Sequence, residues 1–222
     1  MPLLFHSRAV RRSWRQLRHE LGLQRAHRAA VRRARAYRGR VDLLLNLGCG
    51  ENLKPGWVNV DALAPGALPL DLREALPFDD HSATTIYCEH FLEHLEYPKE
   101  VGRFLRECRR VLVPGGRLSL GVPDTEWPVR SYAADEEAYF RLAREKFHPK
   151  WCDTKMHNLN FHFRQGSEHK YAYDYETLAA VLAKQGFTSV RRREFDPLLD
   201  TLARAVGTLY VEATTAEAGV LR

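Results

Sequence analysis

The first residues with chemical meaning are two glycines and an aspartate. Gly48 and Gly50 directly follow the apolar run 41–47, and Asp61 comes eleven positions after Gly50. Glycine after a buried strand permits positive φ and lets a ligand approach the backbone where a Cβ would collide. A carboxylate at the end of the next strand can accept hydrogen bonds from both hydroxyls of a ribose. The spacing favours a ribose-containing ligand, with a tight turn that merely needs glycine as the alternative.

Further polar residues follow the later apolar segments. Asp71, Glu89, His90 and Asp124 each come at the end of a segment predicted to be a strand. In a doubly wound sheet, the carboxyl ends of the parallel strands face the ligand. The order of these residues therefore predicts that they gather at one edge of a sheet.

The segment His90–His94 also reads H-x-x-E-H, an inverted form of a zinc-protease pattern. Two histidines four positions apart can share one face of a helix and one metal ion. Here the motif follows a predicted sheet strand. We therefore predict no metal ion.

The elements that must position these residues alternate along the chain after position 40. Compact apolar or β-branched segments predict strands at 41–47, 57–60, 67–70, 84–88, 117–122, 188–195 and 208–213. Helical periodicity covers 98–112, 132–147 and 175–185, the last with Asp174 as N-cap. The stretch 148–173 is predicted to be irregular. Strands and helices joined by short connections indicate βαβ units and a parallel sheet.

This series of segments resembles the class I S-adenosylmethionine-dependent methyltransferases, in a type 11-like group with a shortened first helix. The pieces that carry the resemblance are LNLGCG (45–50), WVNVDA (57–62), LDL (70–72), LPFDD (76–80), IYCEHFLEHL (86–95), FLRECRRVLVPGGRLSLGVPD (104–124), YETLAAVLAKQGF (175–187) and LYVEA (209–213). The resemblance implies an α/β, Rossmann-like, doubly wound sheet of seven mostly parallel strands with one antiparallel strand. It also implies S-adenosylmethionine as the cofactor.

Carried over position by position, the resemblance implies nine cofactor-binding residues. Gly48, Cys49 and Gly50 would contact the methionine and ribose, and Asp61 would hold the ribose hydroxyls. The remaining five are Asn46 and Ala62 beside these motifs, Asp71 and Leu72 at the adenine, and Glu89 on the sulfonium side.

The sequence departs from the family pattern at three points. Asn46 replaces an acid that often ends the first strand, Asn52 replaces a third glycine, and too few residues separate Gly50 from Asp61 for a full helix and strand. A nicotinamide dinucleotide needs a helix N-terminus there for its pyrophosphate. Pro55 and the short spacing leave that helix no room, which favours the methyl donor.

Methyl transfer to a hydroxyl requires a base, and Asp124 and His90 are the predicted catalytic residues. A turn or helix-capping role is the alternative for Asp124. His157, His162 and His169, together with nearby aromatic residues, form a predicted lid over the acceptor. The resemblance to the group with a shortened first helix implies a small-molecule or glycan hydroxyl as the acceptor. An RNA or protein methyltransferase and a non-catalytic binding domain of the same fold are the alternatives.

Charge divides the chain into a domain at 41–222, with an acceptor-side insertion at about 124–174, and a basic arm at 1–40. The net charge of +6 conceals twelve arginines and one acid, Glu20, within 1–40. Apolar residues at helical spacing predict two short amphipathic helices that divide at Gly22, with Gly39 as the last C-cap. The arm could pack on the body or on a second subunit, contact an anionic membrane, or, less favoured, bind nucleic acid.

Four cysteines without C-x-x-C pairing predict buried, reduced thiols. No apolar run is long enough to span a bilayer. We expect a cytoplasmic protein, with membrane association through the arm as a further expectation.

Overall fold

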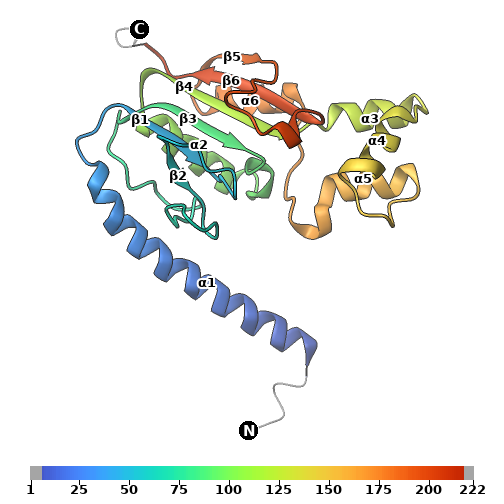
Figure 1. The fold of residues 1–222 in the computed structure, drawn as a ribbon, viewed down its shortest axis with the longest axis horizontal. Helices are drawn as coiled ribbons and strands as arrows, with labels where there is room; N and C mark the ends of the chain where they lie inside the picture. Colours follow the sequence, from blue (N-terminus) through green and yellow to red (C-terminus); the bar gives the residue numbers. More distant parts are fainter. Residues whose placement is uncertain (1–6, 218–222) are drawn as a thin grey trace.

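The computed structural model describes residues 7–217 and contains one six-stranded sheet with flanking helices (Figure 1). The sheet order is β2-β1-β3-β4-β6-β5, in which β6 runs antiparallel to both of its neighbours and the other pairs are parallel. The strands are β1 (Leu43–Leu47), β2 (Val58–Val60), β3 (Ala83–Glu89), β4 (Leu112–Pro123), β5 (Thr188–Arg192) and β6 (Thr208–Thr214). The mixed Rossmann-like sheet and its single antiparallel strand agree with the prediction.

The sheet has six strands and not the predicted seven, because the strand predicted at 67–70 does not form. This segment makes only an isolated parallel bridge between Val60 and Leu68. Pro69 follows at once and has no N–H to donate to a sheet ladder. The backbone therefore continues as a loop at the edge of the sheet.

The helices are α1 (Arg8–Arg33), α2 (Lys99–Val111), α3 (Glu126–Ala133), α4 (Ala138–Lys146), α5 (Lys155–Arg164) and α6 (Tyr175–Lys184). Short 3-10 turns are η2 (Ala34–Tyr37), η3 (Leu92–His94), η4 (Gln165–Ser167) and η5 (Leu202–Arg204). None of the helices within residues 7–217 combines the length and the apolar character needed to cross a bilayer.

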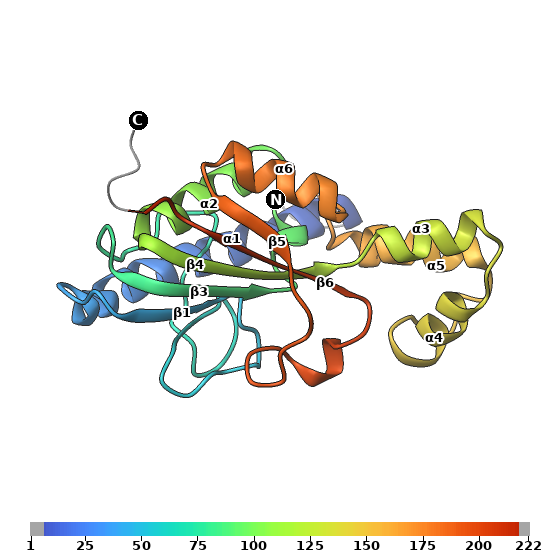
Figure 2. The same ribbon diagram turned by 90° about the horizontal axis from the view of Figure 1, so that it is seen from above.

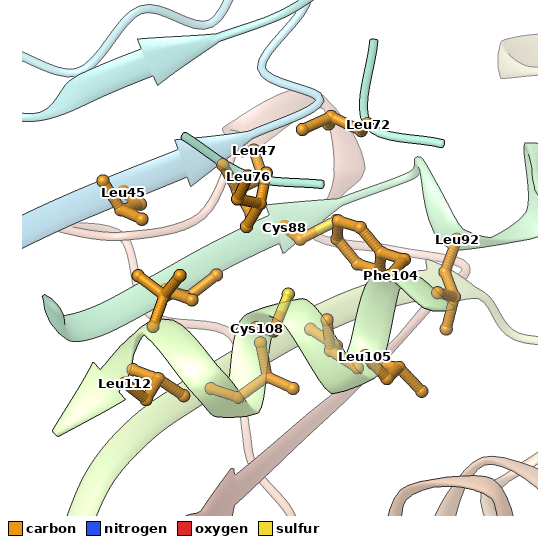
Figure 3. Close-up of a cluster of buried hydrophobic side chains, with 14 of the residues drawn as sticks. Leu45, Leu47, Leu72, Leu76, Cys88, Leu92, Phe104, Leu105, Cys108 and Leu112 are labelled. Carbon is orange, nitrogen blue, oxygen red and sulfur yellow. The ribbon is translucent and has the colours of Figure 1, made fainter. Parts of the chain in front are cut away.

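The main core lies between the sheet and α2 (Figure 3). Leu45 and Cys88 from the strands meet Phe104, Leu105 and other apolar residues of α2, all nearly or fully buried. Helices α1, α2 and α6 lie on one face of the sheet, whereas loops, including 195–207, lie over the other (Figure 2). The sheet is thus wound by helices on one face only, because the β1–β2 and β2–β3 connections contain no helix.

Helix α1 is continuous, so the predicted division at Gly22 is wrong. Ala30 near its C-terminal end, and Ala34 in the adjoining turn η2, are fully buried against the main core. Packing of this end stabilises the helix and outweighs the cost of one interior glycine, about 1 kcal/mol. Four apolar residues of its N-terminal half stay exposed, namely Val10, Trp14, Leu17 and Leu21.

The predicted insertion forms a small helical lobe of α3, α4 and α5 beyond the carboxyl ends of β3 and β4 (Figure 2). It has its own core around Tyr139, Phe140 and Leu159. The prediction that 148–173 is irregular is wrong for α5, where Thr154 accepts a hydrogen bond from the His157 N–H at 3.1 Å. Helix α5 buries only Asn158 and Leu159, which left no apolar stripe to detect.

The predicted helix 132–147 is wrong in its first part, because α3 ends at Ala133 and α4 begins at Ala138. The predictions for Asp174 and for the cysteines agree with the structure. Asp174 caps α6 by accepting the Thr177 N–H at 2.8 Å, and the helix ends just before Gly186. All four cysteines are free and buried. They serve as small core residues, as expected.

Candidate functional site

One cavity of about 380 Å³, which we call the glycine cavity, opens at the carboxyl ends of β1 and β2. It brings together five of the nine predicted cofactor residues, namely Gly48, Asp61, Ala62, Asp71 and Leu72. Its other walls are Leu63, Leu70, Arg73, Phe91, His94 and Leu95 from the domain, and His19, Glu20 and Leu23 from α1.

Position 48 requires glycine because of both its backbone conformation and the side chain packed against it. Its φ is +67°, and a Cβ built there would lie 2.5 Å from the Cγ of Phe91. Its N–H donates to the carbonyl of Val60 at 2.8 Å, which fixes the loop against β2. The loop after β1 therefore packs directly against the loop after β3, and this contact shapes the cavity.

Asp61 lies beside this glycine loop. One carboxylate oxygen accepts the N–H of Gly50 at 3.0 Å, and the other accepts the N–H groups of Leu63 and Ala64 at 2.9 Å. A carboxylate offers about four lone-pair sites, so acceptor capacity remains for a ligand hydroxyl. The three backbone contacts hold the carboxylate at the cavity wall.

Three of the other predicted cofactor residues, Asn46, Cys49 and Gly50, support the loop from outside the cavity lining. The amide of Asn46 donates to the Asn52 carbonyl at 2.9 Å. Burial raises the pKa of the Cys49 thiol to about 11, so the sulfur stays protonated near neutral pH.

Helix α1 closes the side of the cavity that holds Asp71, which sequence reasoning did not predict. The Asp71 N–H donates to Nδ1 of His27 at 3.1 Å, and Arg73 bridges Asp71 and Glu20 at 2.8 Å each. Burial opposes ionisation of Asp71, but the hydrogen bonds from Arg73 prevail and lower its pKa. The detectable signal was Glu20, the only acid among the twelve arginines of the arm.

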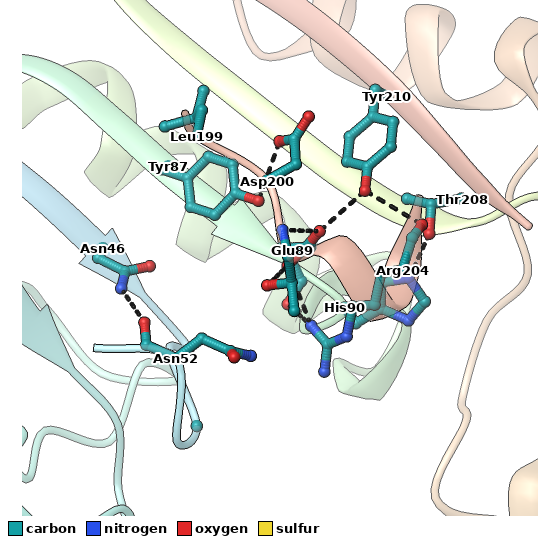
Figure 4. A network of polar contacts seen from close by, with 12 residues as sticks. Asn46, Asn52, Tyr87, Glu89, His90, Leu199, Asp200, Arg204, Thr208 and Tyr210 are labelled. Atoms are coloured by element: carbon teal, nitrogen blue, oxygen red, sulfur yellow. Dashed lines mark hydrogen bonds and ion pairs between the residues drawn. The ribbon is translucent and has the colours of Figure 1, made fainter. Parts of the chain in front are cut away.

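Glu89 does not line the glycine cavity, contrary to its predicted place beside the ligand. Its buried carboxylate accepts the Thr201 hydroxyl at 2.6 Å and the Tyr210 hydroxyl at 3.0 Å, and it pairs with Arg204 at 3.4 Å (Figure 4). These partners surround both oxygens. Glu89 thus anchors the loop 195–207 to the end of β3.

The same loop is tied down at two further points. Asp200 accepts a hydrogen bond from the Tyr87 hydroxyl at 3.1 Å (Figure 4). Both of its carboxylate oxygens also accept hydrogen bonds from the Arg193 guanidinium, at 2.6 Å each. Lys54 Nζ donates to the carbonyl of Leu199. The polar face of β3 therefore holds a loop where a doubly wound sheet would carry a helix.

A second cavity of about 280 Å³, the histidine cavity, lies between the end of β4, the helical lobe and loop 203–208. Four histidines line it: His90, His148, His162 and His169. His157 lies elsewhere, half-exposed and paired with Asp153 at 2.6 Å. The structure therefore brings together two of the three predicted lid histidines and adds two more.

Asp124 lies next to Pro123 of the histidine cavity but is not part of the lining. One of its carboxylate oxygens accepts the N–H of Glu126 at 3.0 Å at the start of α3. Burial raises the pKa of this carboxyl. The contact matches the capping alternative, and proximity to the cavity keeps the catalytic prediction open to test.

His90 and His162 are held neutral near physiological pH. Burial and the nearby Arg204 lower the pKa of His90 to about 3, and its Nε2 lies 2.8 Å from the Thr208 hydroxyl. Burial, with His148 and His169 nearby, lowers the pKa of His162 to about 4. Neutral imidazoles can both donate and accept hydrogen bonds, which suits an uncharged polar ligand.

The low pKa of His162 predicts a loss of stability in acid. The unfolded chain binds this proton near pH 6.5, whereas the folded chain binds it only near pH 4. The free energy of unfolding should therefore fall as the pH drops from 6.5 to 4, by about 2 kcal/mol for this ring after allowance for partial solvent access. Urea titrations across this range should show a shallower decline for His162→Gln.

The surface variant His157→Gln is the control and should keep the wild-type decline. Equal slopes for His162→Gln and the wild type would contradict the assignment.

The segment 90–94 separates the two cavities. Phe91 and His94 line the glycine cavity, whereas His90 lines the histidine cavity. Between them Glu93 is 1% exposed, and burial raises its pKa to about 8. This one short segment therefore forms part of the wall of both cavities.

Comparison with known proteins shows a family match for part of the chain and a similar fold. Residues 59–120 match the model of the family described as methyltransferase domain. A S-adenosylmethionine-dependent methyltransferase from Archaeoglobus fulgidus has a similar fold, with a TM-score of 0.50, 16% identity and coverage of 85% of this chain and 94% of that one. No curated protein sequence matches the chain.

Two further structures are similar at lower scores. The CurJ carbon methyltransferase gives a TM-score of 0.47 at 18% identity over 81% of this chain, which spans only 50% of that one. The 1,6-didemethyltoxoflavin-N1-methyltransferase of Burkholderia thailandensis gives 0.47 at 16% identity over 86% of this chain and 79% of that one.

The matched segment begins inside β2 and ends inside β4, so it includes Asp61, Asp71 and the segment 90–94 between the cavities. The sequence motifs, the matched family and the fold agree. Part of the chain, residues 59–120, therefore matches a methyltransferase-domain family, and its fold is similar to that of a known S-adenosylmethionine-dependent methyltransferase.

Proposed function

We propose that this protein transfers the methyl group of S-adenosylmethionine to a hydroxyl of a small molecule or glycan. The donor would occupy the glycine cavity and the acceptor the histidine cavity. The observation that carries the proposal is that one five-residue segment, 90–94, contributes walls to both cavities. Two ligands bound in these cavities would lie on either side of His90 and Phe91.

The residues of the glycine cavity fit the donor. Asp61 presents a fixed carboxylate to the ribose hydroxyls, and Leu70 and Leu72 offer apolar surface to the adenine. Bound S-adenosylmethionine supplies an activated methyl group, so the protein needs chiefly to position the acceptor. Leu23 and Glu20 of α1 add to the wall of the cavity.

The histidine cavity favours a small, uncharged, hydroxylated acceptor. Its volume of about 280 Å³ is at the lower end of small-molecule sites. The Tyr139 hydroxyl and the neutral rings of His90 and His162 can orient such a molecule by hydrogen bonds. His90 would hold the acceptor, and Asp124 would receive its proton.

The test has two stages. Calorimetry with S-adenosylhomocysteine should detect one site per chain, and labelled donor should then reveal an acceptor in a panel of sugars and phenols. Absence of binding would support the non-catalytic alternative, and transfer only to RNA or protein would support the polymer alternative.

Once an acceptor is found, Asp124→Asn and His90→Gln divide the roles. A fall in kcat with unchanged donor affinity would assign the proton to Asp124. Full turnover by Asp124→Asn would leave that residue as a cap of α3 alone.

We propose in addition that the N-terminal half of α1 contacts an anionic membrane surface from the cytoplasm. Trp14 and Leu17 are about half-exposed, in line with Val10 and Leu21, and arginines flank this stripe. Such a helix can bury its apolar face at the headgroup boundary while its cations meet anionic lipid.

Co-sedimentation with vesicles tests this contact. The full chain should bind vesicles rich in phosphatidylserine at least about tenfold more strongly than Trp14→Ser/Leu17→Ser, since two buried apolar side chains contribute several kcal/mol. Leu198→Ser removes an apolar residue that is 96% exposed outside the stripe and should change nothing. Equal binding by all three proteins would refute the proposal, and salt-sensitive RNA binding in its place would favour nucleic acid.

A further inference from the structure

The buried carboxylate of Glu93 has no hydrogen-bond partner on either oxygen among the described residues 7–217. The side chain is 1% exposed. Two histidine nitrogens lie near its Oε1, Nδ1 of His90 at 3.6 Å and Nε2 of His94 at 3.9 Å. Both distances are too long for hydrogen bonds. A buried carboxyl without partners costs several kcal/mol unless something absent from the polypeptide satisfies it.

One ring nitrogen of His94 and one of His169 lie near this carboxylate. Nδ1 of His94 lies 3.1 Å from the Glu168 carbonyl, and Nδ1 of His169 lies 2.9 Å from the His162 carbonyl. A carbonyl oxygen only accepts, so each Nδ1 must carry the hydrogen. Nε2 of each neutral ring is then left as an acceptor, and metal-binding histidines are commonly oriented by such a bond from the other nitrogen.

The backbone holds these side chains together. The N–H groups of Lys170 and Tyr171 both donate to the Glu93 carbonyl, at 2.7 and 3.3 Å. The rings of His94 and His169 lie edge to face with centroids 5.2 Å apart. One ligand atom from each of Glu93, His94 and His169 lies within 4.8 Å of the other two.

We propose that Glu93, His94 and His169 form a binding site for a divalent transition metal ion of the zinc class. Two imidazole nitrogens and one carboxylate oxygen are ligands that Zn²⁺ prefers, and they leave a fourth tetrahedral position for water. Zinc bonds of about 2.0–2.2 Å place tetrahedral ligand atoms about 3.3 Å apart, so small side-chain rotations would close the site.

This site differs from the one that the H-x-x-E-H pattern would form. His90 has φ +53° and His94 lies in the 3-10 turn η3, so the two do not share a helix face. Nε2 of His90 faces Thr208. The second imidazole comes instead from His169, on the segment that follows α5.

A bound ion would cross-link segment 90–94, between the two cavities, to the segment around His169 that follows the helical lobe. His94 lines the glycine cavity and His169 lines the histidine cavity. The metal would therefore fix the wall that both ligands share. The proposal does not depend on the identity of either ligand.

Zinc titration of the full chain tests the site. After EDTA treatment and dialysis, the wild type should bind one equivalent of Zn²⁺ in competition with a chromophoric chelator, and elemental analysis should confirm the stoichiometry. His94→Gln and His169→Gln should each weaken the affinity at least about 100-fold, since each loses a direct ligand. The surface variant His157→Gln should match the wild type.

Two further readouts keep the result independent of folding and of methyl transfer. Circular dichroism should show the metal-free variants folded, and saturating Zn²⁺ should raise the Tm of the wild type but not that of His169→Gln. Co²⁺ should give the visible absorption of a four-coordinate site in the wild type alone. The proposal fails if the folded wild type binds no Zn²⁺, or binds it as tightly as His169→Gln. S-adenosylhomocysteine binding, measured separately, reports on the proposed function.

Discussion

Replacing Asp61 by asparagine should raise the Kd for S-adenosylhomocysteine by about 10- to 100-fold. The carboxylate is held by the N–H groups of Gly50, Leu63 and Ala64, which leaves acceptor capacity for ribose hydroxyls. Hydrogen bonds to a charged acceptor contribute about 1.5–3 kcal/mol each, and asparagine has only one accepting oxygen. The amide nitrogen would also face a backbone donor, so we expect the free energy of unfolding to fall by about 1 kcal/mol. Calorimetry and a thermal melt measure the two effects.

The matched control is Glu51→Gln, which removes an exposed carboxylate from the same glycine loop. It should leave the Kd unchanged. If Asp61→Asn binds the product as tightly as this control, the ribose assignment is wrong, and with it the placement of the donor in the glycine cavity.

Replacing Gly48 by alanine should abolish measurable donor binding and lower the free energy of unfolding by about 3 kcal/mol. The left-handed backbone conformation costs alanine about 1–2 kcal/mol, and overpacking against a filled site adds about 1–3 kcal/mol. The new methyl group would meet the Phe91 ring at 2.5 to 2.7 Å, so the ring must move into the cavity or the loop must open. For a domain of this size the expected fall in Tm is about 10 °C.

Two variants separate the causes. Gly22→Ala adds a methyl group in α1 with no atom within 4 Å and should neither destabilise the fold nor change donor binding. The double variant Gly48→Ala/Phe91→Ala relieves the steric contact. Its free energy of unfolding should fall by less than the sum of the losses in the two single variants, and a double-mutant cycle would detect this difference. Strict additivity would mean that backbone strain alone explains the effect of Gly48→Ala.

The involvement of α1 changes the interpretation of the basic arm. Its charge directs attention to nucleic acid or lipid, but its C-terminal half packs on the core, and Glu20 pairs with Arg73. The side chains of His19, Glu20 and Leu23 form part of the glycine cavity. The arm is therefore a component of the site as well as a charged surface.

The sequence by itself determined the strands and the loops between them that form the glycine cavity. Strand β1 is apolar at every position except Asn46, and Gly48 and Asp61 stand at the ends of adjacent strands because local chemistry requires those residue types there. The periodicity of apolar residues and the positions of turn residues in the sequence indicate such local features directly. The prediction of a strand at 67–70 was wrong because Pro69 prevents a continuous ladder of hydrogen bonds, although the segment is otherwise apolar.

Only the tertiary structure decided which side chains meet across long separations in the chain. Glu89 contacts loop 195–207, Glu20 pairs with Arg73, and His94 lies beside His169, although no local pattern links these residues. Each pair depends on how a loop or helix returns to the sheet, and that path is set by the packing of the whole core rather than by the period of any one segment. The glycine loop was therefore predictable, whereas the Glu93 cluster and the closure by α1 became visible only in three dimensions.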